Sequence, residues 1–350
     1  MELRERFRGA LLGACLGDAS GSGIESLPHA YLRALNDGRG FEPFLSPPDR
    51  WLPATIWAGY EGVFPEWARK VRELNPGDTT DDWQLTVVCA ESLISSRGWD
   101  IEDCAMRHVE AMHQSDKGWG GTTRSAVIEI RDHKRRPYDL PNNMGRGNRP
   151  LMTIAPLGLF ISLRTHAREH EAQRTCMAHS FLTHGDPRAG IAAYAAVLVY
   201  EAVFRSAITS FQDAVACLES VVPRVRALER QYVRMLPHGA DSISDRLARL
   251  PDVWHDPDAL REMWGTDGDS LITCPFTLGS FFRHPTDGRA ALIETLNAGG
   301  DTDTNASIVG ALVGANAGPS AFPSSWVEYR PEYRASLDLA DRLYQVATSF

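Results

Sequence analysis

Two stretches of the sequence carry a glycine at every fourth residue, and this spacing constrains the fold more than any other feature. The first column is Gly9, Gly13 and Gly17, and the second is Gly310, Gly314 and Gly318. Residues four apart lie on one face of an α-helix, so each column leaves a strip of bare backbone. Glycine weakens a helix, so a repeated column indicates close backbone packing. We expect the two helices to be neighbours in one core.

The rest of the chain also follows helical spacing. Apolar residues recur three and four apart, as in Leu85, Val88, Cys89 and Leu93, and no convincing alternating strand pattern occurs. The sequence therefore predicts an all-α fold, a single compact multi-helix domain over residues 1–350. Segment 41–78 is rich in proline, which breaks helices, and in tryptophan and phenylalanine. We expect it to be an ordered excursion that shapes a cleft.

Composition and cysteine use exclude several classes of protein. The net charge is −9, with 36 basic and 45 acidic residues, which disfavours a nucleic-acid-binding protein. The six cysteines form no metal-binding spacing and are expected to be buried thiols in a reducing compartment. Leu12 to Cys15 resembles a lipoprotein cleavage box, but the apolar stretch before it is short for a signal sequence. The aliphatic run 191–200 is too short to cross a bilayer, so we expect a cytoplasmic protein.

Two acidic blocks, each at the expected start of a helix, are the main candidates for chemistry. One is Asp78-Thr79-Thr80-Asp81-Asp82 and the other is Gly299-Gly300-Asp301-Thr302-Asp303-Thr304. Helix capping explains one acidic residue at such a place but does not require several. Brought together, the blocks would hold carboxylates that repel one another unless a cation neutralises them. Oxygen ligands alone favour magnesium, manganese or calcium. Caps with ordinary surface charge remain the alternative.

Three other features are open to two interpretations on sequence alone. Asp18 directly follows Gly17, the last glycine of the first column, and is most simply a helix cap or structural acceptor. Glu25 lies shortly after it and is either a solvated glutamate, the common case, or a catalytic one. His184 is either a substrate contact or a buried hydrogen-bonding histidine. The loop Gly118-Trp119-Gly120-Gly121 covers a cleft or is a plain turn. The phosphate loop, the dinucleotide fingerprint and the serine nucleophile elbow are missing from the sequence.

Together these blocks resemble the ADP-ribosylglycohydrolase family, in the order in which that family has them. The matching stretches are GALLGACLGDASGSGIE, TTDDWQL, GWGGTTRSA, LTHGDPRAGIAAYAA and LNAGGDTDTNASIVGALVGANAG. The resemblance covers residues 5 to about 330. It implies an all-α domain with a central cleft for two Mg²⁺ ions, with Mn²⁺ as a possible substitute.

The resemblance also assigns roles to residues. The metal ligands it implies are Thr80, Asp81, Asp82, Asp301, Asp303 and Thr304. The candidates for acid–base catalysis are Glu25, Asp82 and Asp301, with no basis for choosing among them. The candidates for substrate contacts are Gly118, Trp119, Gly120, Gly121, Asn148, Arg149 and His184.

Three positions depart from the family pattern: Trp83, Arg149 and Thr153. Arg149 replaces a glycine in a loop that faces phosphates in relatives, so it either reaches a diphosphate or blocks the backbone approach. The leading hypothesis is a hydrolase that removes ADP-ribose from a protein side chain, so that its partner is an ADP-ribosylated protein. The alternatives are hydrolysis of a small free ADP-ribosyl or ribosyl compound, and a non-catalytic ADP-ribose-binding protein.

Overall fold

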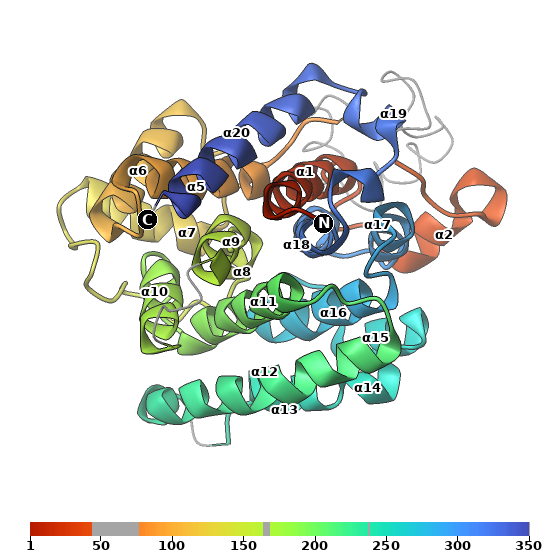
Figure 1. Cartoon of the computed structure of the whole chain (residues 1–350). Helices are drawn as coiled ribbons and strands as arrows, with labels where there is room; N and C mark the ends of the chain where they lie inside the picture. Colours follow the sequence, from red (N-terminus) through yellow and green to blue (C-terminus); the bar gives the residue numbers. More distant parts are fainter. Residues whose placement is uncertain (44–76, 164–168, 237–238, 350) are drawn as a thin grey trace.

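The computed structural model describes residues 1–43, 77–163, 169–236 and 239–349, and these are helical apart from turns and loops (Figure 1). Within them, the only strand-like pairings are two isolated bridges, Pro28–Gly299 and Gly147–Asp269. The all-α, single-domain prediction is confirmed. The α-helices are α1 (Leu3–Gly21), α2 (His29–Gly38), α5 (Asp81–Ser96), α6 (Ile101–Gln114), α7 (Gly121–Arg131), α8 (Arg149–Met152), α9 (Ala155–Leu163), α10 (Glu169–Phe181), α11 (Pro187–Arg205), α12 (Phe211–Tyr232), α13 (Ile243–Ala248), α14 (Leu250–Val253), α15 (Pro257–Trp264), α16 (Ser270–Arg283), α17 (Gly288–Asn297), α18 (Thr302–Ala317), α19 (Ser324–Val327) and α20 (Pro331–Thr348). Two short 3₁₀ helices, η1 (Val233–Met235) and η2 (Pro319–Ala321), complete the set.

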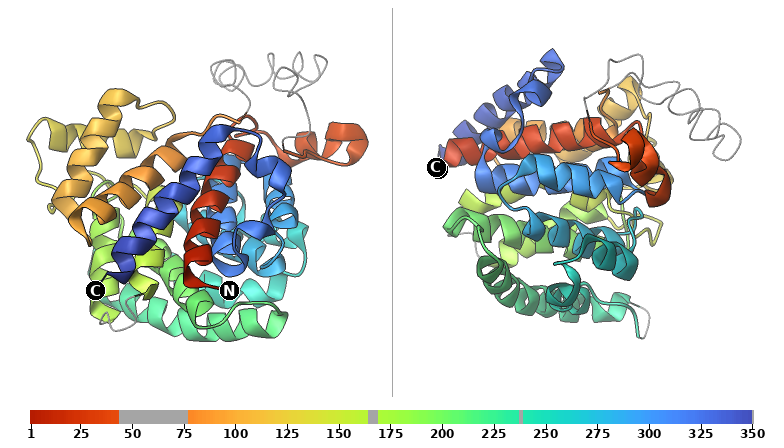
Figure 2. Two further views of the ribbon diagram at one scale, coloured as in Figure 1. Left: turned by 45° about the horizontal axis from the view of Figure 1, so that its top comes forward. Right: turned by 90° about the vertical axis from the view of Figure 1, so that its right-hand side faces the viewer.

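The two glycine columns face each other, as the sequence predicted. A Cβ atom on Gly9 would overlap the backbone of Gly314, and one on Gly13 would overlap the carbonyl group of Gly310. Gly17 has the same relation to Ala306. The residue numbers rise on α1 as they fall on α18, so the two helices run antiparallel with their backbones in contact. The right-hand view of Figure 2 shows them side by side along their length.

This antiparallel contact places the end of α1 beside the second acidic block. The last residue of α1, Gly21, packs against the backbone of Thr302 and Asp303 at the first turn of α18. The chain leaving α1 towards Glu25 therefore passes directly over the second acidic block. A packing feature of two helices thus brings together residues nearly 300 positions apart.

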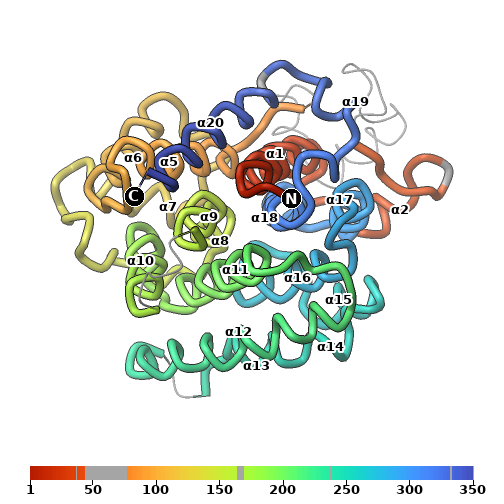
Figure 3. Tube along the Cα trace, in the orientation of Figure 1, coloured from red at the N-terminus to blue at the C-terminus, as the bar shows by residue number. Residues whose placement is uncertain are grey.

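The remaining helices form layers around this pair (Figures 1 and 3). α20 and α5 lie on one side of α1, while α16 and α17 contact α18 on the other. α11 packs on α16, and α12 and α13 form the outermost layer. α11 is long and apolar enough to cross a membrane by composition, but 83% of its most apolar window is buried inside the protein, as in a core helix.

Two further sequence predictions concern segment 41–78 and the cysteines. Most of segment 41–78 lies outside the described residues, so its expected role in shaping a cleft stays a prediction. All six cysteines are buried and none forms a disulfide, as expected for free thiols.

Candidate active site

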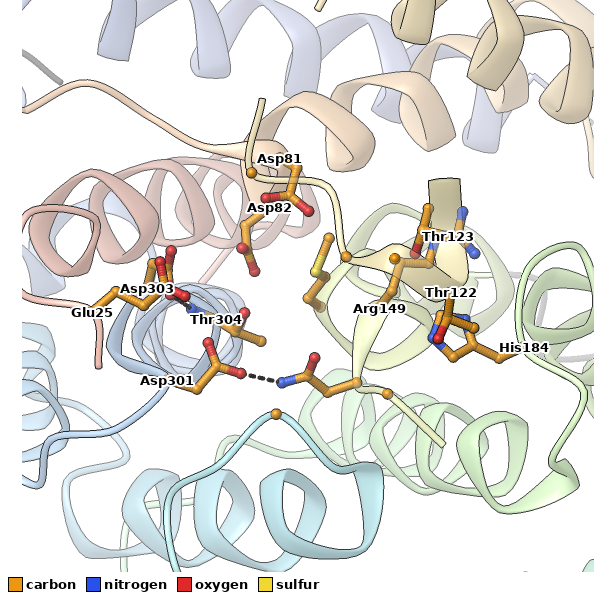
Figure 4. A pocket seen from close by; sticks show the side chains of 17 residues that line it. Glu25, Asp81, Asp82, Thr122, Thr123, Arg149, His184, Asp301, Asp303 and Thr304 are labelled. Carbon is orange, nitrogen blue, oxygen red and sulfur yellow. Dashed lines mark hydrogen bonds between the residues drawn. The ribbon is translucent and has the colours of Figure 1, made fainter. Parts of the chain in front are cut away.

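A cavity of about 200 Å³ opens where the end of α1, the start of α5 and the start of α18 meet (Figure 4). Its walls carry most of the site residues expected from the sequence. The lining residues are Glu25, Asp81, Asp82, Gly118, Gly120, Gly121, Thr122, Thr123, Gly147, Asn148, Arg149, Met152, His184, Gly268, Asp301, Asp303 and Thr304. Two of the predicted site residues, Thr80 and Trp119, do not line the cavity.

The first acidic block is held in place by Asp18 on α1. The Asp18 carboxylate accepts hydrogen bonds from the Thr80 backbone N–H (2.9 Å), the Thr80 hydroxyl (2.8 Å) and the Trp83 backbone N–H (2.9 Å). Thr80 is also the N-cap of α5, because its side chain accepts a hydrogen bond from the Asp82 N–H. An acid from another helix therefore satisfies N–H groups that a helix start leaves unpaired. This fixes the direction in which Asp81 and Asp82 leave α5.

The second acidic block follows a tight turn at Gly299 and Gly300. Both glycines have positive φ angles, 78° and 76°, a conformation that suits glycine. The Gly300 N–H donates to the Leu27 carbonyl, and the Ser26 N–H donates to the Gly300 carbonyl. The segment before α18 is thereby bonded to the segment that follows Glu25, and together they form one wall of the cavity.

Asp301 is fixed from the opposite wall by Asn148. The Asn148 side-chain amide donates to Asp301 Oδ2 (2.6 Å) and to the Thr273 hydroxyl (3.0 Å). The backbone N–H of Asp301 donates to the Thr266 carbonyl. Sequence reasoning expected Asn148 to contact substrate, whereas its amide group orients a carboxylate of the site.

Within the described chain, the carboxylates form two groups that share one residue. Asp18, Asp82 and Asp303 are all buried and make up the inner triad. Glu25, Asp301 and Asp303 make up the outer triad, in which Glu25 and Asp301 are partly exposed. In each triad, oxygen atoms of all three residues lie within 4.8 Å of one another. Sequence reasoning treated Asp18 as a cap or structural acceptor. It is one, and it also belongs to the acidic cluster.

The surroundings of these carboxylates disfavour negative charge. Burial raises the pKa of Asp82 well above its usual range, and the charges of Asp18, Asp81 and Asp301 raise it further. Burial, followed by the charge of Glu25, also raises the pKa of Asp301. Burial raises the pKa of Asp18 to about 6, although its bonds to Thr80 and Trp83 oppose the shift. Full ionisation of these carboxylates is therefore unfavourable unless a cation nearby neutralises their charge.

One buried oxygen in the cluster lacks a partner. Among the described residues, Asp82 Oδ1 has no hydrogen bond although it is shielded from solvent. A buried acceptor without a partner is unusual and costs free energy. Together with two oxygen-only triads, it fits a hard divalent cation of the magnesium or calcium type.

The glycine loop lines the cavity, but Trp119 does not. Gly118, Gly120 and Gly121 are in the wall, with Gly118 at a positive φ of 85° against the Asp81 carboxylate. The Trp119 ring is buried behind the loop, where Nε1 donates to Gln84 Oε1 (2.7 Å). The ring lies outside the cavity lining in this conformation, and its contact with a ligand stays a prediction. Its indole N–H is hydrogen-bonded to a residue of α5, and a tertiary contact of this kind cannot be predicted from the local sequence.

Arg149 lines the cavity, but its guanidinium group is committed elsewhere. Only 4% of the residue is exposed, and the guanidinium donates to the His179 carbonyl and contacts His108 Nε2. In this conformation the guanidinium group belongs to a buried network, and its contact with a diphosphate stays a prediction. Thr153, one helical turn later, donates to the Arg149 carbonyl and contacts His179 Nε2. The two departures from the family pattern thus belong to one buried network.

His184 lines the cavity as expected and is neutral there. It is 2% exposed, and its Nδ1 lies 2.9 Å from the Thr183 hydroxyl. Burial, and then the charge of Arg149, lower its pKa to about 3. Trp83, the third departure, contributes its backbone N–H to Asp18 rather than its ring to the cavity wall.

Several wall residues were not singled out from the sequence. They are Thr122, Thr123, Gly147, Met152 and Gly268. Gly268 precedes the bridge between Gly147 and Asp269, and a Cβ there would lie 2.9 Å from Asp301 Oδ2. Two glycines within residues 265–268 are typical of a loop, but only the fold shows that this loop faces the second acidic block.

Comparison with known proteins agrees with this architecture. The family model for ADP-ribosylglycohydrolase matches residues 1–349. An uncharacterised protein of Archaeoglobus fulgidus is 27% identical over 314 residues, which cover 89% of this chain and 87% of that protein. ADP-ribosylarginine hydrolase Tri1 of Serratia proteamaculans is 27% identical over 196 residues, covering 53% of this chain and 44% of Tri1.

A solved structure shares the fold over nearly the whole chain. It is described as an ADP-ribosylglycohydrolase-related protein complex, and it matches with a TM-score of 0.62 and 24% sequence identity. The match covers 99% of both chains. With the family model matching almost every residue, the chain belongs to the ADP-ribosylglycohydrolase family.

Proposed function

We propose that this protein is a magnesium-dependent hydrolase that cleaves the glycosidic bond between ADP-ribose and a modified protein side chain. The observation that carries the proposal is the pair of carboxylate triads that share Asp303 beside one cavity. The chain's membership of the ADP-ribosylglycohydrolase family supports the reaction class.

Two Mg²⁺ ions fit the residues present, and Mn²⁺ would suit the same oxygens. The proposed ligands are Thr80, Asp81, Asp82, Asp301, Asp303 and Thr304, with Glu25 and Asp18 close by in the two triads. When bound, such ions would hold the ribose hydroxyls and make a water molecule more acidic. Asp82 Oδ1, which has no hydrogen-bond partner among the described residues, is the oxygen atom that best supports a bound cation.

The three candidate catalytic carboxylates differ in what they can do. Asp82 is the most buried of the three and its Oδ1 has no partner among the described residues, so we assign it to cation binding. Asp301 has one oxygen engaged by the Asn148 amide, which holds it in a single orientation. Glu25 is partly exposed at the cavity wall, where it can exchange protons with solvent. We therefore assign general acid–base catalysis to Glu25.

The proposal is tested by incubating the protein with Mg²⁺ and a protein that is ADP-ribosylated on arginine. We begin with arginine because one relative is named an ADP-ribosylarginine hydrolase. Free ADP-ribose should be released, and Asp303→Asn should abolish the release because Asp303 belongs to both triads. Asp245→Asn, which changes an exposed carboxylate on α13, is the matched control and should be active.

A parallel assay with small ADP-ribosyl-arginine separates the alternatives. Release from the small compound but from no modified protein would favour a small-molecule substrate. Calorimetry that shows tight ADP-ribose binding without any release would favour a binding protein. We also propose a cytosolic location, which the free, buried state of all six cysteines supports.

A further inference from the structure

A second cavity, of about 360 Å³, lies between α2, α15 and α17, and no residue of the acidic triads lines it. The three helices lie near one another on one side of the molecule (Figure 1). This volume is within the range of about 300–1,000 Å³ that is usual for small-ligand sites. The second cavity is therefore large enough for a ligand of the size of a sugar phosphate.

Its lining is cationic, in a protein whose net charge is −9. Four arginines, Arg33, Arg39, Arg261 and Arg289, line it together with His29 and His284. Against them stand two carboxylates, Asp258 and Glu294. Such a local excess of guanidinium groups attracts anions.

The two carboxylates of the lining are already paired with basic groups. Glu294 accepts from Arg283 through both oxygens (2.5 and 2.9 Å) and contacts His284. Asp258 lies 3.5 Å from Arg261. Arg289 is likewise paired with Glu42, and Arg261 with Glu262 (3.3 Å). Among the described residues, the guanidinium groups of this lining that have no carboxylate partner are therefore those of Arg33 and Arg39.

Two arginines at the α2 side keep their charge available. Within the part of the chain that the structure describes, Arg39 donates only to the carbonyl and side chain of Asn36, which are neutral groups. No carboxylate among the described side chains forms an ion pair with Arg33 or Arg39. Both arginines are exposed. In addition, Arg261 Nε is buried without a hydrogen-bond partner in the described structure.

From the volume and this charge we propose that the second cavity binds a small phosphate ester. Guanidinium groups match phosphate oxygens through paired, charge-assisted hydrogen bonds. The volume suits a sugar or nucleoside monophosphate and is too small for a folded protein. The two paired carboxylates in the lining disfavour a long polyanion such as nucleic acid.

The lining of the second cavity is continuous along the chain with residues that line the acidic cavity. His29, Asn297 and Ala298 line it, and His29 Nδ1 lies 2.6 Å from the Asn297 carbonyl. These residues continue directly into the two bonded segments that carry Glu25 and Asp301. A phosphate ester bound here would therefore contact residues that lead directly into the segments carrying the outer triad.

The test is calorimetry of the full-length protein with ribose 5-phosphate, and with unphosphorylated ribose as the control ligand. EDTA in the buffer leaves the acidic cavity without cations, so an anion is repelled there. The wild-type protein should bind ribose 5-phosphate and not ribose. Arg33→Ala combined with Arg39→Ala should weaken binding at least about tenfold, because the two unpaired guanidinium groups are lost.

The matched control is Arg226→Ala combined with Arg230→Ala, which removes the same charge from α12 and should bind as the wild type does. Asp303→Asn should also retain binding, because it alters only the acidic cavity. Melting curves confirm that each variant is folded. Failure of the wild type to bind, equal binding by the Arg33/Arg39 variant, or loss of binding in Asp303→Asn would overturn the proposal. Because the assay measures binding without turnover, its outcome is independent of the proposed hydrolase activity.

Discussion

The carboxylate of Asp18, on α1, accepts hydrogen bonds from both the backbone N–H and the hydroxyl of Thr80, at the start of α5. A residue of the glycine-column helix thus holds the first acidic block, while the same helix packs against α18, which begins with the second. α1 is therefore the element that sets the two blocks relative to each other.

Asp18→Asn should weaken Mg²⁺ binding at least about tenfold and lower the free energy of unfolding by about 2 kcal/mol. An amide cannot accept all of the hydrogen bonds that Asp18 accepts, and bonds to a charged group contribute about 1.5–3 kcal/mol each. The measurements are calorimetric titration with Mg²⁺ and denaturant unfolding. Asp100→Asn is the control, since Asp100 also accepts hydrogen bonds from N–H groups at a helix start, as the N-cap of its own helix α6, and asparagine caps equally well. Equal loss in both variants would contradict the positioning role.

Asp82→Asn should make the metal-free protein more stable while removing its stabilisation by Mg²⁺. Burial and three neighbouring acids raise the pKa of Asp82, so the folded state pays for its charge. The sign follows from this shift: the gain is absent below about pH 4, where the unfolded side chain is protonated too, and grows as pH rises towards neutrality. Melting curves in EDTA across this range measure it. A variant less stable than wild type near neutral pH would contradict the account.

Gly13→Ala should destabilise the protein by at least about 3 kcal/mol, because the added methyl group would overlap the carbonyl of Gly310. Denaturant unfolding measures the loss. Gly98→Ala is the matched control, since a Cβ there meets nothing within 4 Å. Equal stability of Gly13→Ala and the control would show that the helices are not in backbone contact.

Arg149→Met should raise the pKa of His184 from its value of about 3, since the charge of Arg149 is one cause of the depression. Burial is the larger cause, so the pKa should stay below the ordinary value of about 6.5. Titration followed by NMR of the histidine ring measures the change. An unchanged His184 pKa would show that the guanidinium group lies farther from the cavity wall than in this structure.

The same variant tests what Arg149 does. If its guanidinium serves the buried network with His108 and the His179 carbonyl, Arg149→Met should lower stability by about 1–3 kcal/mol, because the buried carbonyl loses the bond from Arg149. The KM for an ADP-ribosylated substrate should change less than about threefold. A large rise in KM with unchanged stability would instead restore the diphosphate contact that the sequence suggested.

The sequence predicted those parts of the site that depend on local patterns. The glycines at every fourth residue identified the α1–α18 contact, because only a close approach of two backbones explains that spacing. The acidic blocks were recognisable because capping a helix does not need several carboxylates. Their convergence depends on Asp18, which bonds the first block to the helix that packs against α18, and helical spacing did not predict this contact.

What the sequence could not predict depends on partners far away in the chain. Trp119 is buried because Gln84, on α5, accepts its indole N–H. Arg149 turns inward because α6 supplies His108 and α10 supplies the His179 carbonyl. The spacing of apolar residues indicates which face of a helix a side chain occupies. It does not indicate which hydrogen-bond acceptor of another helix that side chain contacts. The second cavity was missed for the same reason, since α2, α15 and α17 are distant in sequence.

The most direct test of the account is a crystal structure of the protein soaked with Mn²⁺, with anomalous scattering used to locate the ions. The account predicts two anomalous peaks in the acidic cavity, one at each triad and both next to Asp303, and neither peak in Asp303→Asn. A crystal with no peak in this cavity, or with ions bound only elsewhere, would contradict the claim that the paired acidic blocks form a metal centre.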